Sequence, residues 1–199
     1  MSNERLQNAL ALIDAANAED PERELHEGVE QPKSLLYGQR MSAWLERLCP
    51  EAPEPLRLAV RAQHIRRWRI PRDRYPQGRI GYLQWRKDLM KYHAEQAGAL
   101  LEQADYSADV IERVQSLLKK ERIKQDPDAQ TLEDVACLVF LSHYFTDFAG
   151  AYDDDKLVDI LRKTWRKMSP RGHEAALALD LDERTQRLVG RALSDEGRA

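Results

Sequence analysis

Residues 131–141 read Thr-Leu-Glu-Asp-Val-Ala-Cys-Leu-Val-Phe-Leu, and the last seven residues of this stretch are all apolar. An apolar run without polar alternation is typical of a helix that is enclosed on every side. We therefore expect a helix that begins at about Thr131 and forms the centre of the core. In this interpretation Glu133 and Asp134 lie in the first turn of that helix.

Apolar residues recur at helical spacing through most of the remaining chain. The polar stretch 22–32, which contains Gly28 and Pro32, is instead expected to form a loop. No alternation typical of strands persists in the sequence, so the predicted fold class is all-α, a single-domain helical bundle. Helices are expected at residues 3–17, 33–48, 54–68, 81–104 and 107–122. Three more are expected near the C-terminus: one from the acidic turn 153–155 to residue 168, a short one after residue 170, and a last one at 182–195.

The 199 residues fit one domain, expected to span residues 1–199. With 42% hydrophobic and 33% charged residues, the composition is that of a globular protein. No apolar run approaches the roughly 18–20 residues that span a membrane, and the N-terminus lacks an apolar signal core. Cys49 and Cys137 are isolated thiols, which fit a reducing compartment. We expect a cytoplasmic protein without a membrane partner.

The formal net charge of −3 conceals a strongly basic segment, residues 57–91. This basic segment contains eleven Arg and Lys residues but only two acidic residues, Asp73 and Asp88. An uneven charge distribution of this kind attracts anionic ligands. The alternative is a solvated surface with scattered ion pairs. Because two acidic residues cannot neutralise eleven basic ones locally, we favour an anion-binding role.

Three residues of the types that bind metals lie on faces expected to be apolar: His64, His93 and Asp134. A polar group buried without a partner costs roughly 2–7 kcal/mol, so each must find a partner in the core. Imidazole and carboxylate groups are the usual ligands of divalent first-row metals. The sequence therefore predicts a divalent metal bound by these three residues, with Glu133 or Asp134 acting as a general base.

The same residues also have a purely structural interpretation. A single histidine on an apolar face is more often a hydrogen-bonded core residue than a ligand. A carboxylate in the first turn of a helix is stabilised by the helix dipole by roughly 0.3–1 kcal/mol. No His-Glu-x-x-His motif and no paired-cysteine motif supports a metal site. Both interpretations stay open on the sequence.

Aromatic and arginine residues are interleaved in the basic segment. Trp68 follows Arg67, and Arg72 and Arg86 lie close to further aromatic residues. Aromatic rings beside guanidinium groups can stack a nucleobase while the arginines hold its phosphate. Lys120 is expected to add positive charge to this substrate-binding surface. The alternatives are tryptophans buried under arginine side chains and, for Lys120, a solvated helix end.

Five longer strings carry a family resemblance. They are Leu-Leu-Tyr-Gly-Gln-Arg-Met (35–41), Ala-Gln-His-Ile-Arg-Arg-Trp (62–68), Gly-Tyr-Leu-Gln-Trp-Arg (81–86), Thr-Leu-Glu-Asp-Val (131–135) and Lys-Thr-Trp-Arg-Lys-Met (163–168). Together they resemble the domain-of-unknown-function family 4202 over about residues 5–180. That family implies no activity.

The stretch Arg-Ala-Gln-His-Ile (61–65) is also similar to the His-Asp helix of the HD superfamily of metal phosphohydrolases. The resemblance places His64 in the position of that metal-binding histidine and Asp134 in that of the distant aspartate. It places His93 in the position of the additional histidine that two-metal members carry. The resemblance therefore implies an HD-like helical core that hydrolyses a phosphate ester with a divalent metal.

Two positions depart from the HD pattern. Ile65 stands where the superfamily has the aspartate of its His-Asp pair, and Tyr37 stands where it has an early histidine. The site is then either a rearranged metal centre or a metal-free binding pocket.

Two functions follow from these interpretations. The first is metal-dependent hydrolysis of a nucleotide or another phosphate ester, because a divalent metal lowers the pKa of its bound water toward about 7. The second is a non-catalytic helical module that binds a nucleotide or RNA through the basic segment. A scaffold whose histidines and aspartate only satisfy each other is a third interpretation. The expected partner is a phosphorylated small molecule, a nucleotide or a nucleic acid, and the sequence leaves open whether the chain is an enzyme.

Overall fold

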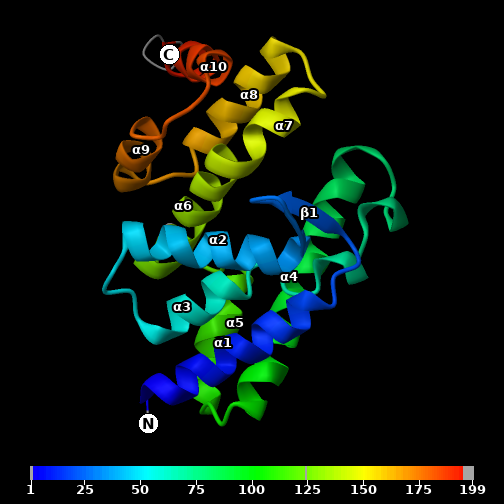
Figure 1. Cartoon of the computed structure of the whole chain (residues 1–199), viewed down its shortest axis with the longest axis vertical. Coiled ribbons are helices and arrows are strands. Elements are labelled where there is room, and N and C mark those ends of the chain that lie inside the picture. The colour runs from blue at the N-terminus through cyan, green and yellow to red at the C-terminus, as the bar shows by residue number, and fades with distance from the viewer. Residues whose placement is uncertain (1, 124, 195–199) are drawn as a thin grey trace. The chain divides into compact units, whose positions relative to one another are not determined.

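The structure, a computed structural model, describes residues 2–123 and 125–194 and is mainly helical (Figure 1). This confirms the predicted all-α class. The chain divides into two compact units, Met1–Leu132 and Glu133–Ala199. The α-helices are α1 (Ser2–Ala18), α2 (Lys33–Leu48), α3 (Glu54–Arg61), α4 (Gly78–Gln103), α5 (Ala108–Leu118), α6 (Pro127–Val139), α7 (Phe145–Ala149), α8 (Asp154–Trp165), α9 (Pro170–Leu177) and α10 (Glu183–Ser194). Residue 195, where the last helix was expected to end, lies outside the described residues.

The first unit is built around α4, which packs along α5. Helix α3 also packs against α5, and α2 packs against α3, while α1 contacts α2, α3 and α4. Burying one large apolar side chain stabilises the fold by roughly 1.5–3 kcal/mol, so this shared core is the main source of stability. Its most deeply buried large residues are Ile13, Met41, Leu56, Leu58, Ile65, Leu101, Leu117 and Leu132.

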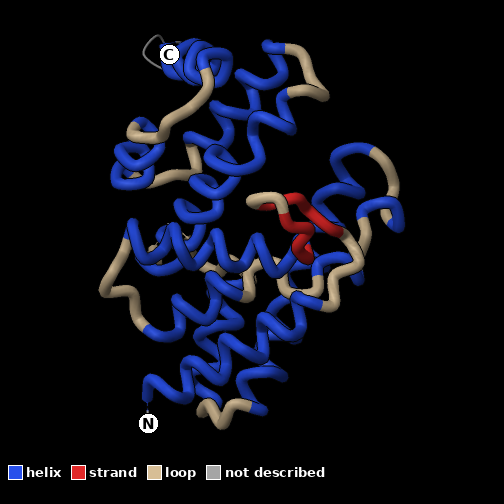
Figure 2. The backbone as a smooth tube through the Cα atoms, viewed as in Figure 1, coloured by secondary structure: helices blue, strands red, loops and turns tan. Residues whose placement is uncertain are grey.

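A short β-hairpin occupies residues 23–32, where a loop was expected, so that prediction was wrong. Strands β1 (Arg23–His26) and β2 (Val29–Pro32) pair antiparallel, with His26 opposite Val29 (Figure 2). The turn residues Glu27 and Gly28 have φ values of 51° and 80°, the left-handed conformation that a tight two-residue hairpin turn requires. Apolar alternation typical of a strand is absent here because Leu25 and Val29 are exposed and neither face of the hairpin is buried.

Helix α3 ends at Arg61, so the prediction of a helix as far as Trp68 was also wrong. The chain turns instead, and Arg66 adopts a left-handed conformation with φ 49°. The backbone N–H of Arg66 donates to Oδ1 of Asn17 in α1 at 3.1 Å. A left-handed residue other than glycine costs about 1 kcal/mol, which this long-range hydrogen bond helps to offset. His64 therefore lies in a turn and not on a helix face. The 3₁₀ segments η1 (Arg67–Arg69) and η2 (Arg72–Arg74) follow it.

Helix α6 begins at Pro127, four residues earlier than predicted. Proline suits the first helical position, and the carboxylate of Asp126 accepts the backbone N–H of Asp128 at 3.0 Å. Glu133 and Asp134 therefore lie in the middle of the helix, and the expectation that they occupy its first turn was wrong. Their stabilisation comes from tertiary contacts rather than from the helix dipole.

In the second unit, α8 packs against α10, and the apolar run 135–141 is buried as predicted at most of its positions. A π-helical segment, η3 (Phe140–Tyr144), continues α6. The carboxylate of Asp153 caps α8 by accepting the N–H of Lys156 at 2.8 Å. No helix among the described residues is both long and apolar enough to cross a membrane. The most deeply buried large residues of this unit are Leu138, Phe145, Leu157 and Leu188.

Candidate functional site

Five side chains of the first unit gather into what we call the His–Arg cluster: Tyr37, His64, Arg67, Trp85 and His93. The ring of His64 stacks on that of Tyr37, with centroids 4.0 Å apart and 15° between the planes. The centroids of the two histidine rings are 6.0 Å apart. The guanidinium carbon of Arg67 lies 4.7 Å from the centroid of Trp85. The structure thus brings together His64 and His93, which the sequence had paired as candidate ligands.

Three parts of the fold position these groups. Tyr37 comes from α2, His64 and Arg67 from the turn after α3 and its continuation, and Trp85 and His93 from α4. The indole N–H of Trp85 donates to the carbonyl of Ile70 at 2.9 Å and ties α4 to the chain after η1. The cluster therefore depends on the packing of α2 and α4 around one irregular turn.

His93 is buried and has a defined tautomer. Its Nδ1 lies 2.8 Å from the carbonyl oxygen of Ile65, which can only accept, so Nδ1 carries the proton. Its Nε2 therefore bears a lone pair, and this atom is buried without a hydrogen-bond partner in the described part of the chain. Burial lowers the pKa of His93 to about 3, so the ring is neutral at pH 7.

His64 is half-buried and also neutral at pH 7. Burial lowers its pKa well below the ordinary 6.5, and nearby positive charges, among them Arg67, Lys120 and Arg86, lower it further. The Nη1 of Arg67 lies 3.5 Å from Nε2 of His64, and because a guanidinium can only donate, this nitrogen is the acceptor. Both imidazoles therefore act as neutral groups in a positive field.

Arg67 is half-buried, and burial is the main cause that lowers its pKa. No carboxylate lies within 4 Å of its guanidinium among the residues that the structure describes. Its contacts there are the face of Trp85 and the ring nitrogen of His64. A charge taken partly out of water normally requires a counter-charge. Arg67 therefore has no ion-pair partner within 4 Å among the described residues, and the acidic residue that acts on it, Glu22, does so only at longer range.

The remaining predicted substrate-binding residues divide into two groups. Arg86 and Lys120 are close enough to lower the pKa of His64, so they add to the positive field of the cluster. The guanidinium of Arg72 instead donates to the carbonyls of Tyr75 and Pro76, both at 2.9 Å, and holds the loop before α4. Trp68 is half-buried in η1, next to Arg67 in the chain.

Asp134 and Glu133, the predicted catalytic residues, belong to the second unit. Both oxygens of the buried Asp134 carboxylate accept hydrogen bonds from Ser169, one from its N–H at 2.8 Å and one from its hydroxyl at 2.5 Å. A Cβ at Gly172 would lie 2.8 Å from this carboxylate, so only glycine fits there. Glu133 is buried, with its Oε1 3.9 Å from Nζ of Lys167. Asp134 thus anchors the start of α9.

No group of three or more His, Cys, Asp or Glu side chains placed to hold a metal occurs among the described residues. In the His–Arg cluster, His93 offers a bare Nε2 lone pair, whereas the Nε2 lone pair of His64 already faces the guanidinium of Arg67. A cation there would be repelled by the positive charges around His64 unless an anionic ligand accompanied it. The electrostatics of the cluster therefore favour an anion.

Among the described residues, hollows also lie outside the cluster, and two of them are large or enclosed enough to consider. The larger, of about 360 Å³, lies among α1, α2 and α3, but its arginines are already engaged. Arg61 donates to both carboxylate oxygens of Asp14 at 2.6 Å, and Arg57 donates to the carbonyls of Ala52 and Pro50. Neither arginine is left to recognise an anion.

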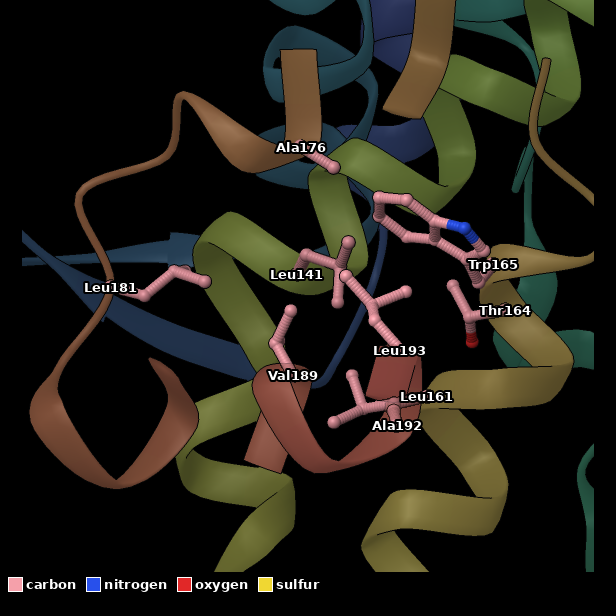
Figure 3. Close-up of a pocket in the computed structure, with 9 residues that line it drawn as sticks. All are labelled: Leu141, Leu161, Thr164, Trp165, Ala176, Leu181, Val189, Ala192 and Leu193. Carbon is pink, nitrogen blue, oxygen red and sulfur yellow. The ribbon is translucent and has the colours of Figure 1, made fainter. Parts of the chain in front are cut away.

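The smaller hollow lies in the second unit and is lined mainly by apolar side chains such as Leu141, Leu161 and Val189 (Figure 3). Its volume of about 20 Å³ is room for about one water molecule. The hydroxyl of Thr164 in its wall already donates to the carbonyl of Ile160 at 2.9 Å. We therefore regard this hollow as a packing feature and place the candidate site at the His–Arg cluster.

The buried histidine predicts a pH dependence of folding. The pKa of His93 is about 3 in the folded chain and near 6.5 when unfolded, so between these values only the unfolded chain binds the proton. Stability is complete above about pH 6.5 and should fall toward pH 3 by about 1.4 kcal/mol per pH unit for this one histidine. Urea unfolding of the chelator-treated protein at pH 7, 6, 5 and 4 measures this slope. His93→Gln should reduce this slope, while the contribution of His64, whose pKa is also lowered, remains. Parallel curves for the two proteins would contradict the prediction.

Asn17 was not predicted as a functional residue, although its Oδ1 accepts the backbone N–H of Arg66, next to Arg67. A signal was present, because Asn17 continues the apolar spacing of Ala9 and Ile13 along α1 and is itself buried. A polar residue on an apolar face was the criterion that singled out His64 and His93. The same criterion applied to the first helix would have found Asn17.

The fold and the cluster describe a mainly helical protein whose first unit places two neutral histidines beside an arginine. The chain belongs to the DUF4202 family, a domain of unknown function, whose model matches residues 7–189. This confirms the family predicted from the sequence. No curated protein and no solved structure matches the chain.

Proposed function

We propose that the first unit binds a phosphorylated small molecule, such as a nucleotide, at the His–Arg cluster. The observation that carries this proposal is the guanidinium of Arg67, which is half-buried without a carboxylate partner in the described residues. A phosphate would neutralise this charge through charge-assisted hydrogen bonds, which are the strongest kind in proteins. Arg86 and Lys120 would strengthen the attraction.

The neutral histidines fit the same ligand. A phosphate monoester carries a protonated oxygen for part of the time near pH 7, because its second pKa is about 6. The lone pair on Nε2 of His93 is an acceptor that lacks a donor in the described chain. The aromatic ring of Tyr82, 5.9 Å from that of Trp85 and partly exposed, offers a face for a nucleobase.

A second candidate function is metal-dependent hydrolysis of this ligand by an HD-like core. It is favoured by His93, because an Nδ1–H bound to a backbone carbonyl with Nε2 bare is the usual arrangement of a metal-binding histidine. The first unit also brings together three residues that stand at HD ligand positions: Tyr37, His64 and His93. His64 and His93 would hold the metal, which would supply a nucleophilic hydroxide. Asp134 and Glu133 stay predicted participants, and a cytoplasmic location stays part of this proposal.

The binding proposal is tested by calorimetry on the chelator-treated protein with AMP, adenosine and inorganic phosphate. We expect AMP to bind at least ten times more tightly than adenosine, because only AMP reaches Arg67 with a charge. Arg69→Gln is the matched control for the loss of the charge at Arg67, because Arg69 lies in the same segment but is well exposed. Equal affinity for AMP and adenosine, or binding only of long RNA with a steep salt dependence, would contradict the proposal.

Hydrolysis is tested separately by phosphate release from AMP with Mn²⁺, Zn²⁺ or Mg²⁺ added. The hydrolase candidate requires turnover that His93→Gln and Asp134→Asn both abolish. Binding without turnover under every metal leaves the first proposal in place and ends the second.

A further inference from the structure

We infer that Asn17 is a positioning residue for Arg67: its hydrogen bond to the backbone of Arg66 holds the left-handed turn that delivers the guanidinium to the His–Arg cluster. The inference rests on the proposed ligand site, but it concerns the placement of Arg67, which can be measured without a ligand.

The first observation is the contact itself. Asn17 lies near the end of α1 and is 1% exposed, and its Oδ1 accepts the N–H of Arg66 at 3.1 Å. Arg66 is 49 residues away in sequence and stands immediately before Arg67. A buried side-chain amide is thus used to fix the backbone at one residue of a turn.

The second observation is the conformation of that residue. Arg66 has φ 49° and ψ 34°, a left-handed geometry that side-chain-bearing residues rarely adopt and that glycine adopts freely. An arginine remains in this conformation only where the surroundings determine it. Its guanidinium is also engaged, because Nη1 donates to Oε1 of Gln96 in α4 at 2.9 Å. Arg66 is therefore fixed by α1 through its backbone and by α4 through its side chain.

The consequence falls on the next residue. The φ and ψ of Arg66 set the direction in which the chain enters η1, and therefore the direction of the Arg67 side chain. With the left-handed turn in place, the guanidinium of Arg67 lies over Trp85 and beside His64. If Arg66 relaxed to a negative φ, the backbone would leave the turn in another direction and Arg67 would lose both contacts.

The test compares Asn17→Ala with Asn8→Ala, a change at an exposed asparagine of the same helix. Two quantities are measured: the affinity for AMP, and the rate at which phenylglyoxal modifies Arg67, followed by peptide mass spectrometry. Asn17→Ala should weaken AMP binding about ten-fold and speed the modification of Arg67 several-fold, whereas Asn8→Ala should change neither. Adding Arg66→Gly to Asn17→Ala should restore most of both values, because glycine holds the left-handed turn unaided.

If Asn17→Ala does not fold, Arg66→Gly and Arg66→Val in the otherwise unchanged chain decide the question. Arg66→Gly should keep Arg67 protected although the contact to Gln96 is lost, and Arg66→Val should expose it, because a β-branched residue opposes a positive φ. The inference is overturned if Asn17→Ala only lowers stability while Arg67 stays protected, or if glycine gives no rescue. Exposure of Arg67 in a protein that binds no phosphate compound would support the positioning role and reject the proposed function.

Discussion

Replacement of Arg67 by methionine is expected to remove phosphate binding and at the same time to stabilise the unliganded protein. The loss of one charge-assisted anion contact costs roughly 1.5–3 kcal/mol, which is a 10- to 150-fold weaker affinity for AMP. Stability should rise by about 1 kcal/mol, because methionine fills a similar volume without placing in the protein a half-buried charge that lacks an ion-pair partner. The loss of the contact with Trp85 reduces this gain.

Opposite signs for binding and stability distinguish a ligand-binding charge from a structural one. Calorimetry with AMP and urea unfolding without ligand measure the two quantities on the same preparation. Arg69→Met removes an exposed charge two residues away and should change both only slightly. A variant at position 67 that unfolds more easily and binds AMP as before would show that Arg67 serves the fold alone.

Asp134→Ala is expected to destabilise the second unit by about 3 kcal/mol, because two hydrogen bonds to a buried carboxylate are lost. Ser169 caps α9, because its hydroxyl oxygen accepts the N–H of Gly172. In the variant Ser169 no longer has Asp134 as its acceptor, so amide hydrogen exchange should quicken most at the start of α9. Asp134→Asn retains one acceptor oxygen and should cost less. Urea unfolding followed by a probe in the second unit measures the change.

A double-mutant cycle with Ser169→Ala assigns this energy to the contact. The two changes should be less than additive, because Ser169→Ala removes the hydroxyl that donates to Asp134, whereas the backbone N–H of residue 169 remains as a donor. Asp180→Ala, at an exposed position of the same unit, is the control and should lie within about 0.5 kcal/mol of the unaltered protein. Additive effects would place the role of Asp134 elsewhere, and loss of a bound metal with little loss of stability would favour the hydrolase.

The fold class, most helices and the pairing of His64 with His93 followed from the sequence. Helical periodicity is local, since residues three and four apart share a face whatever the rest of the chain does. Family membership followed equally, because long strings of residues are a direct property of the chain. The basic segment was visible for the same reason. The sequence does not show, however, which of its arginines is half-buried, as Arg67 is, and which is exposed, as Arg69 is.

Only the tertiary structure decided which of these residues form a site. The hairpin has no buried face, so its strands left no apolar alternation, and Leu25 and Val29 are exposed. The left-handed turn at Arg66 has its hydrogen-bond partner in Asn17, 49 residues earlier in the chain, and the role of Asp134 depends on Ser169, 35 residues further along. Hydrogen bonds between distant residues have no periodicity that a sequence can display. The amino-acid sequence thus determined the helices and the number of charged residues. Tertiary packing decided that Arg67 has no ion-pair partner among the described residues, and that the Asp134 carboxylate accepts two hydrogen bonds from Ser169.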